Sequence, residues 1–415
     1  MALNLRDRLK RIQQTKRAEP VTRAVDLSPF AARGWAPAGF LTLRREITAG
    51  ENIALPPAMP AAAGLLMPGI RAGTDYRDLL FFDLETTGLS GGAGTVAFLA
   101  AFGRLDRAGK LRITQYLLLD YPGENDFIEA LLGEFDAGGN AATMVSYNGK
   151  CFDSQILKTR CLMNAIAPPE YRHADLLHPA RRLWKRLLPD CSQAAIETGV
   201  LGIDRTGDVP GALAPDIWFE FLRSGGTEPL FGICEHNRRD IAGLAAIFSA
   251  LARIADDPFD AAKKINFDLE ALALRWRENS RYEADTSLRA TGQSLLRFAA
   301  EQGYPRAAFV YALSLLKEGK RDDGRKWLLK TASAACPPPL QASALRALAI
   351  DSERRLKNAE EALSFTEQAL ALLAPDSPRR EEFERRLRRL RIKRPHTEDT
   401  ESCCPADSLE DTKEL

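Results

Sequence analysis

The sequence has few of the features that would mark a zinc protein, a membrane protein or a basic nucleic-acid coat. Its seven cysteines include no C-x-x-C pair, which removes the usual zinc signature and suits free thiols in a reducing compartment. It contains no run of about 18 apolar residues, and residues 1–17 are amphipathic and charged without an apolar signal-peptide core. The net charge is +1, so any nucleic-acid binding must come from local patches. We therefore expect a cytoplasmic protein with no membrane partner.

The remaining composition is that of a globular chain with several domains. Hydrophobic residues make up 45% and charged residues 27% of the 415 residues, enough for two or three domains. Composition shifts predict four segments: a strap and linker with one strand pair around residues 39–45 (1–75), a main domain (76–256), a helical domain (257–395) and a disordered acidic tail (396–415).

Apolar runs in the main domain predict strands before helices. Strands are expected at 79–86, 95–105 and 111–120, with a hairpin turn at 106–110, followed by a helix at 124–135 and a strand at 143–147. Further helices are expected at 154–163, 178–188, 192–199 and 232–253, and a short strand near 173–177. Three antiparallel strands followed by a helix and another strand are the order of a ribonuclease H-like α/β fold, a mixed sheet flanked by helices.

Two carboxylates interrupt the first apolar strand. Side chains alternate along a strand, so Asp83 and Glu85 point to the same face while Leu84 points to the other. Two like charges on a buried face repel each other, and a bound cation between them would stabilise both. The alternative is a strand whose last acids are merely solvated.

Two further acids and a histidine complete a candidate site. Asp153 stands at a strand-to-helix turn, where it could alternatively only cap the helix. His236 and Asp240 are four residues apart on one helix face, although His236 could also be a simple packed histidine. Four carboxylates suit hydrolysis of a phosphodiester by two Mg²⁺ or Mn²⁺ ions. We predict that Asp83 bridges both ions, that Glu85 and Asp240 complete one or the other, and that Asp153 holds the second through water. His236 would orient or deprotonate the attacking water.

Three short motifs carry a family resemblance. DLETTG at 83–88, YNGKCFD at 147–153 and HNRRD at 236–240 resemble the three motifs of the DEDD exonuclease superfamily. The chain is most similar to the YprB-type ribonuclease H-like family, whose members also resemble the proofreading domains of family-B DNA polymerases. The resemblance covers about residues 34–252, and more loosely the helices that follow. It implies a metal-dependent 3′-to-5′ exonuclease acting on DNA or RNA.

One departure concerns the third motif. The tyrosine subgroup has Y-x-x-x-D and the histidine subgroup has H-x-x-x-x-D, whereas this chain has a histidine at the tyrosine spacing. A general-base role for His236 is therefore an inference from its chemistry.

Basic residues near the motifs are candidate contacts for a single-stranded 3′ end. A basic helix with an interleaved aromatic ring suits phosphate neutralisation and base stacking, although such a stripe can also be a solvated face. The predicted nucleic-acid contacts are Asn148, Arg181, Arg182, Trp184, Lys185, Arg186 and Arg239. Gly91, Gly92 and Gly94 could admit a terminal nucleotide or form a plain hairpin loop, and no Walker lysine follows them.

The C-terminal region predicts an all-α helical-repeat domain. Residues 308–332 and 344–369 each contain two apolar helices around a polar turn, with an offset of about 36 residues, close to the tetratricopeptide period. An unrelated helical bundle is the alternative. Residues 379–394 are basic and could extend a nucleic-acid track or be neutralised by the acidic tail. The alternative for the whole chain is a non-catalytic scaffold that binds nucleic acid and recruits a protein through its repeats, but the complete set of four acids favours an enzyme.

Overall fold

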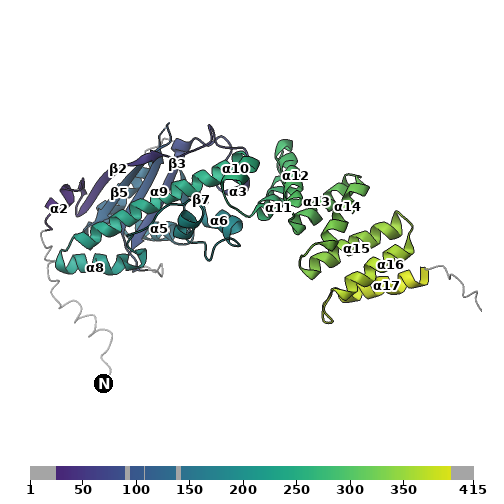
Figure 1. Cartoon of the computed structure of the whole chain (residues 1–415). Coiled ribbons are helices and arrows are strands. Elements are labelled where there is room, and N and C mark those ends of the chain that lie inside the picture. Colours follow the sequence, from purple (N-terminus) through teal and green to yellow (C-terminus); the bar gives the residue numbers. More distant parts are fainter. Residues whose placement is uncertain (1–24, 89–93, 107, 137–141, 394–415) are drawn as a thin grey trace, which may run out of the picture. The chain divides into compact units, whose positions relative to one another are not determined.

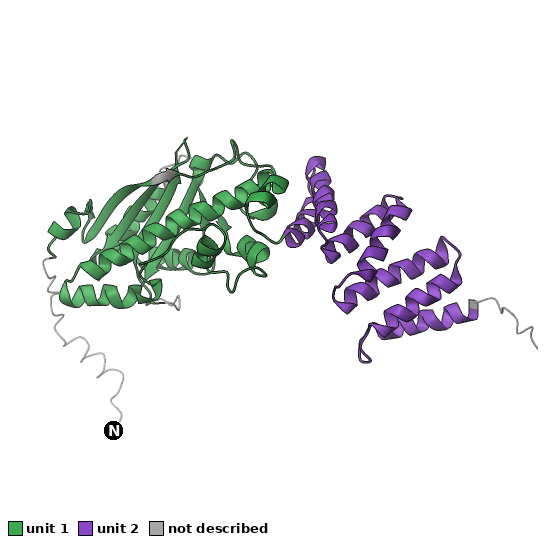
Figure 2. Ribbon diagram, viewed as in Figure 1, with its two compact units in different colours: residues 1–268 green, residues 269–415 purple. Residues whose placement is uncertain are grey.

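The computed structural model describes residues 25–88, 94–106, 108–136 and 142–393, arranged in two compact units (Figures 1 and 2). The first unit spans Met1–Asp268 and the second Leu269–Leu415. Gly91, Gly92 and the predicted acidic tail lie outside the described residues. Among those that are described, no helix is both long and apolar enough to cross a membrane.

A seven-stranded mixed sheet organises the first unit. Its order is β1-β2-β5-β4-β3-β6-β7, with β3 antiparallel to β4 and parallel to β6. The strands are β1 (Ala36–Gly39), β2 (Thr42–Asn52), β3 (Leu79–Thr86), β4 (Ala97–Leu105), β5 (Lys110–Leu118), β6 (Thr143–Ser146) and β7 (Arg172–Asp175). This order confirms the predicted ribonuclease H-like mixed sheet.

The N-terminal segment differs from the prediction of a strap. Strand β2 pairs antiparallel with β5, from Thr42 opposite Leu118 to Asn52 opposite Lys110, so it belongs to the sheet. Strand β2 carries several charged side chains, so its sequence does not show the apolar pattern by which a strand is recognised. For example, Arg44 donates to Glu46 at 2.9 Å on the solvent side. The main chain supplies the pairing, and main-chain hydrogen bonds leave no signature in the sequence.

Helices flank both faces of the sheet. The helices and 3₁₀ turns of this unit are α2 (Ser28–Ala31), α3 (Ala63–Leu66), η1 (Tyr76–Asp78), η2 (Tyr121–Gly123), α4 (Glu124–Asp136), α5 (Asp153–Met163), α6 (Leu177–Trp184), α7 (Gln193–Gly199), η3 (Gly211–Leu213), α8 (Ala214–Ser224), α9 (Glu228–Asp256) and α10 (Pro258–Lys264). Helix α8 is not predicted from the sequence, and its Trp218 stacks on Phe98 of β4 at 5.1 Å between ring centroids.

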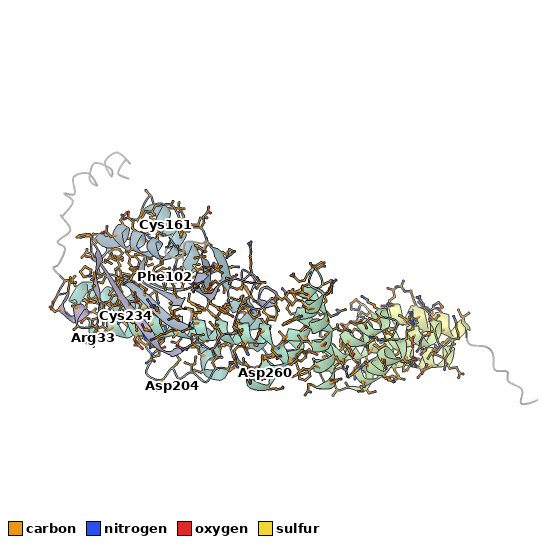
Figure 3. The ribbon with its side chains drawn as sticks, turned by 90° about the horizontal axis from the view of Figure 1, so that it is seen from above. Arg33, Phe102, Cys161, Asp204, Cys234 and Asp260 are labelled. Atoms are coloured by element: carbon orange, nitrogen blue, oxygen red, sulfur yellow. The ribbon has the colours of Figure 1, made fainter. Side chains whose placement is uncertain are left out.

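Successive aromatic residues of β3 identify which helix covers which face. The ring of Phe82 packs edge-on against Phe135 of α4, at 6.2 Å between centroids. Phe81 packs on Phe248 of α9, at 5.6 Å. Because neighbouring residues of a strand point to opposite faces, α4 and α9 lie on opposite sides of the sheet. Phe102 of β4, labelled in Figure 3, joins the apolar core on the α4 side, since its ring contacts Phe135.

The first unit extends beyond the predicted boundary at residue 256. The indole N–H of Trp184 donates to the carbonyl of Asn266 at 2.9 Å, and the Asp268 amide donates to Leu183 at 2.9 Å. Residues 257–268 therefore complete the packing around α6, and the boundary between the units follows Asp268.

The described part of the second unit, residues 269–393, contains helices and no strands, as predicted. Its helices are α11 (Leu269–Ser280), α12 (Thr286–Glu301), α13 (Pro305–Lys317), α14 (Arg321–Ser333), α15 (Pro338–Arg354), α16 (Ala359–Ala371) and α17 (Arg380–Lys393). Polar contacts recur between residues 36 apart: Arg325 with Glu361, Arg379 with Ser343, and Arg306 with Glu270. Equivalent positions of successive helix pairs thus meet, as stacked repeats require. The closer likeness to tetratricopeptide repeats stays a prediction.

Candidate active site

Strand β3 directs Asp83 and Glu85 toward helix α9. Both residues share the face of Phe81, which packs on Phe248 of α9. Glu85 is buried and Asp83 is half-buried. The alternation predicted from the sequence therefore places the two carboxylates side by side under the helix that carries the third motif.

A buried hydrogen-bond relay fixes the carboxylate of Asp83. The Nδ2 of Asn237, on α9, donates to Asp83 Oδ2 at 2.7 Å. Asn237 Oδ1 in turn accepts from Gln115 Nε2 at 2.8 Å, and Gln115 also donates to the Cys234 carbonyl at 2.8 Å. Asn237 and Gln115 are both fully buried. Neither residue is predicted from the sequence, although a glutamine in the apolar strand 111–118 is a signal that could have identified Gln115.

Asp153 joins the same group from the first turn of α5. Phe152 occupies the N-cap position and makes no side-chain cap, and Asp153 is only 6% exposed, so helix capping does not account for this residue. The preceding loop approaches closely: a Cβ at Gly149 would lie 3.0 Å from Asp153 Oδ2 and 2.4 Å from Ser146 Oγ. Glycine at 149 thus leaves room for the carboxylate.

The charges of Asp153 and Asp240 act on both Asp83 and Glu85. Burial, and then the nearby charges of Asp240 and Asp153, raise the pKa values of Asp83 and Glu85 well above their ordinary range. Burial raises the pKa of Asp153 to about 7. Ionised carboxylates are therefore disfavoured here unless cations balance them.

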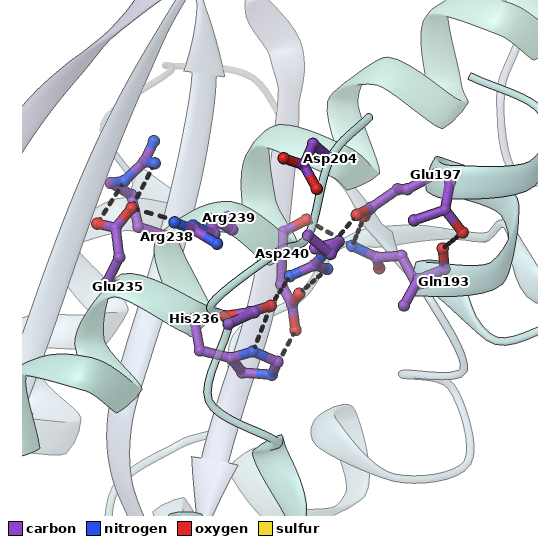
Figure 4. Close-up of polar contacts among 12 residues, drawn as sticks. Gln193, Glu197, Asp204, Glu235, His236, Arg238, Arg239 and Asp240 are labelled. Carbon is purple, nitrogen blue, oxygen red and sulfur yellow. Dashed lines mark hydrogen bonds and ion pairs between the residues drawn. The ribbon is translucent and has the colours of Figure 1, made fainter. Parts of the chain in front are cut away.

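His236 lies between two carboxylates (Figure 4). Its Nδ1 is 3.0 Å from Asp208 Oδ2, and its Nε2 is 3.4 Å from Asp240 Oδ2. Ligand atoms of Glu85, His236 and Asp240 all lie within 4.8 Å of one another. The ring is tightly enclosed, since a Cβ at Gly211 would lie 2.8 Å from Nε2.

Among the described residues, Arg205 is the one cationic side chain that directly contacts a carboxylate of the candidate site. Its guanidinium donates to Asp240 Oδ1, to Glu197 Oε2 at 2.5 Å and to Asp208 Oδ2 at 2.6 Å. Burial raises the pKa of Glu197, and the Arg205 hydrogen bond opposes that rise. Neither Arg205 nor Asp208 is predicted from the sequence, because both come from the loop 201–210, which has no periodic pattern.

Comparison with known proteins agrees with this geometry. Residues 80–252, which include all four acids and His236, match the model of the RNase_H superfamily. This segment therefore has a ribonuclease H-like fold. Over 184 residues the chain is 38% identical to YprB of Bacillus subtilis strain 168, a protein described as uncharacterized. The aligned region covers 44% of this chain and 43% of YprB, so the chain spans less than half of that relative.

The predicted stacking role of Trp184 is wrong. The ring is fully buried in the ribonuclease H-like unit, and its N–H is bonded to Asn266. Trp184 is buried while the neighbouring Arg181 and Lys185 are exposed, so a base cannot reach the ring. Trp184, which stands between cationic residues in the sequence, is therefore a core residue.

The other predicted nucleic-acid contacts have different surroundings. Arg186 pairs with Asp268, and Arg239 lies 3.3 Å from Glu235 Oε1 (Figure 4). Asn148 is exposed, and its backbone N–H donates to Asp175 Oδ1 at 2.8 Å. A role in binding nucleic acid stays a prediction for Asn148, Arg181, Arg182, Lys185, Arg186 and Arg239.

Gly243 is expected to be intolerant of any side chain. It follows Asp240 by about one turn of α9, and a Cβ there would lie 1.7 Å from Glu197 Oε1. Gly243→Ala should therefore displace the Glu197 carboxylate from Arg205 and lower the free energy of unfolding by about 3 kcal/mol. Urea unfolding followed by circular dichroism measures the change.

Gly133→Ala is the matched control for that substitution. Gly133 also lies within a helix, α4, but a Cβ there would meet nothing within 4 Å. Alanine at 133 should stabilise the protein by about 0.5–1 kcal/mol through helix propensity. Equal effects of the two substitutions would show that the close approach of Glu197 to α9 is not a constraint.

Proposed function

We propose that the ribonuclease H-like domain is a metal-dependent nuclease that removes nucleotides from the 3′ end of DNA or RNA by a two-metal-ion mechanism. The observation that supports this best is the convergence of four carboxylates, Asp83, Glu85, Asp153 and Asp240, from three elements. The proposal is tested by incubating the full chain with end-labelled DNA and RNA strands in the presence of Mn²⁺.

The four carboxylates fit divalent cations. Mg²⁺ and Mn²⁺ prefer oxygen ligands, and the raised pKa values of Asp83, Glu85 and Asp153 indicate negative charge that the protein itself leaves unbalanced. Asp83, Glu85, Asp153 and Asp240 would hold the ions. When bound, two such ions supply an activated water and stabilise charge on the leaving oxygen.

His236 is suited to handle the proton of the attacking water. Asp208 lies 3.0 Å from Nδ1 and would stabilise the ring when it is protonated. The other ring nitrogen, Nε2, lies 3.4 Å from Oδ2 of Asp240, which is one of the four carboxylates. His236 would therefore orient the water and accept its proton at Nε2.

The non-catalytic scaffold has one observation in its favour. Arg205 contacts Asp240 and could balance part of the negative charge without any metal. However, this single cation is also shared with Glu197 and Asp208, and the pKa values of Asp83 and Glu85 still lie well above their ordinary range. The incomplete neutralisation favours the enzyme.

Replacement of His236 tests its proposed role. His236→Ala should lower kcat by about 10²- to 10⁴-fold, the usual contribution of a positioned general base, with a smaller effect on KM. His236→Tyr should retain more activity, because a tyrosine at this spacing can still place the water. Steady-state kinetics across the pH range separate the two roles. If wild type and His236→Ala show pH profiles of the same shape, His236 is not the titrating base.

A further inference from the structure

Four cationic side chains surround one hollow in the helical unit. Arg277 comes from α11, Arg281 from the turn after it, Arg289 from α12 and Lys317 from the last turn of α13. We call these four residues the basic pocket. The hollow has a volume of about 270 Å³ and is open to solvent. It has room for several water molecules, and therefore for a phosphate group.

The basic pocket holds excess positive charge. Within the described part of the chain, none of its four cations forms an ion pair with an acid. The one acid in its lining, Glu318, lies 2.9 Å from Lys320 Nζ and also accepts from Gln293 at 3.2 Å. Burial, and then the nearby charge of Arg281, lower the pKa of Arg277. An anion would relieve this repulsion between like charges.

The arginines of α17 offer a contrast. Residues 379–394 were expected to extend a nucleic-acid track or to be neutralised by the acidic tail, and both remain predictions. Among the described residues, Arg386 and Arg389 both pair with Glu353 of α15, and Arg391 pairs with Glu367 of α16 at 3.2 Å. Much of this charge is therefore balanced by the preceding helices, and the basic pocket is the stronger candidate for binding an anion.

An exposed aromatic residue is the sequence neighbour of one of the four cations of the basic pocket. Tyr282 directly follows Arg281 in the turn between α11 and α12, and 85% of the residue is exposed. Water-exposed aromatic rings beside cations are typical of surfaces that bind single strands, because the cations contact phosphates and the ring stacks on a base. An acidic protein segment would use the cations but would have no need of the ring.

We propose that the basic pocket binds the phosphodiester backbone of a single-stranded nucleic acid and that Tyr282 stacks on one of its bases. The planar guanidinium groups of Arg277, Arg281 and Arg289 match phosphate oxygens in pairs of hydrogen bonds. The binding requires no metal and no hydrolysis, so it stands independently of the nuclease proposal.

Binding is measured on the full chain in EDTA, by fluorescence anisotropy of a labelled single-stranded DNA over a series of KCl concentrations. The pocket variant Arg281→Gln/Arg289→Gln/Lys317→Gln should bind about tenfold or more weakly at low salt. The slope of log affinity against log salt should fall by about 2, as expected for three lost phosphate contacts to a single strand. Tyr282→Ala should weaken binding about fivefold or more without changing this slope.

The control removes three charges from elsewhere in the same unit. Lys326→Gln/Arg385→Gln/Arg388→Gln changes the net charge equally at exposed positions of α14 and α17, and should leave most of the affinity and the slope unchanged. Equal affinities and slopes for the pocket and control variants would overturn the proposal. If a polyglutamate peptide bound through the pocket while DNA binding did not depend on it, the surface would belong to an acidic protein partner. Should the triple variant unfold, Arg289→Gln alone must still lower the slope by about 0.7.

Discussion

Asp83→Asn is expected to lower the rate of phosphodiester hydrolysis by at least about 10³-fold while the fold is retained. Asparagine preserves the size of the side chain and can still accept the hydrogen bond from Asn237, which holds position 83 in place at 2.7 Å. It removes the negative charge of the carboxylate that would bind both ions in the proposed mechanism. The rate is measured with end-labelled strands in Mn²⁺, and circular dichroism confirms the fold. Retention of most of the activity would contradict the two-metal assignment.

The same variant should stabilise the protein without metal at alkaline pH. The folded-state pKa values of Asp83 and Glu85 are raised, and that of Asp153 is about 7, so these groups bind protons that the unfolded chain releases near pH 4. Their contribution to stability is therefore lost as pH rises from about 4 toward 7 and above. Asp83→Asn removes one of these groups and one source of repulsion.

Urea unfolding in EDTA tests this expectation. At pH 8 Asp83→Asn should be more stable than wild type by about 1–3 kcal/mol, and the difference should shrink at pH 4. Saturating Mn²⁺ should stabilise wild type by about 3 kcal/mol at 100 times its dissociation constant, and the variant much less. A wild-type protein that is indifferent to Mn²⁺ and more stable than Asp83→Asn at pH 8 would show that no cation site exists here.

Arg205→Met is expected to be among the most destabilising single substitutions in the ribonuclease H-like domain. The Glu197 side chain is fully buried and pairs with Arg205, whose loss would leave the carboxylate without its cation. Breaking such a buried pair costs about 3–5 kcal/mol, whereas replacing both partners costs much less. Urea unfolding should therefore show a large loss for Arg205→Met and a substantial recovery in Arg205→Met/Glu197→Gln.

An exposed pair supplies the control for this cycle. Arg223 pairs with Glu220 on the surface of α8, with side chains 71% and 56% exposed. Arg223→Met should change stability by no more than about 0.5 kcal/mol. If Arg205→Met cost no more than Arg223→Met, or if Glu197→Gln gave no recovery, the buried network would not be holding the loop against α9.

Local periodicity explains what the sequence could predict about the site. The period of two along β3 placed Asp83 and Glu85 on one face, and the spacing of four on α9 placed His236 beside Asp240, as their atoms 3.4 Å apart confirm. These relations depend only on a strand or helix being formed. They needed no knowledge of the tertiary fold.

Tertiary packing explains what the sequence could not predict. Arg205 and Asp208 reach the site from a loop, and nothing local indicates that they meet α9. Asn237 lies inside the third motif, but its role depends on Gln115 of strand β5, which is distant in the sequence. Trp184 looked like a stacking ring because its neighbours are cations, whereas residues 257–268 fold back over α6 and bury it.

Hydrolysis of end-labelled strands by the full chain tests the central claim most directly. Single- and double-stranded DNA and RNA, labelled at the 5′ end in one set and the 3′ end in another, are incubated with Mn²⁺ or with EDTA and resolved on a denaturing gel. The account predicts progressive shortening of a 5′-labelled strand in Mn²⁺, early release of the label from the 3′-labelled strand, and no change in EDTA. Intact substrates in every Mn²⁺ reaction, under conditions in which Mn²⁺ demonstrably stabilises the protein, would contradict it.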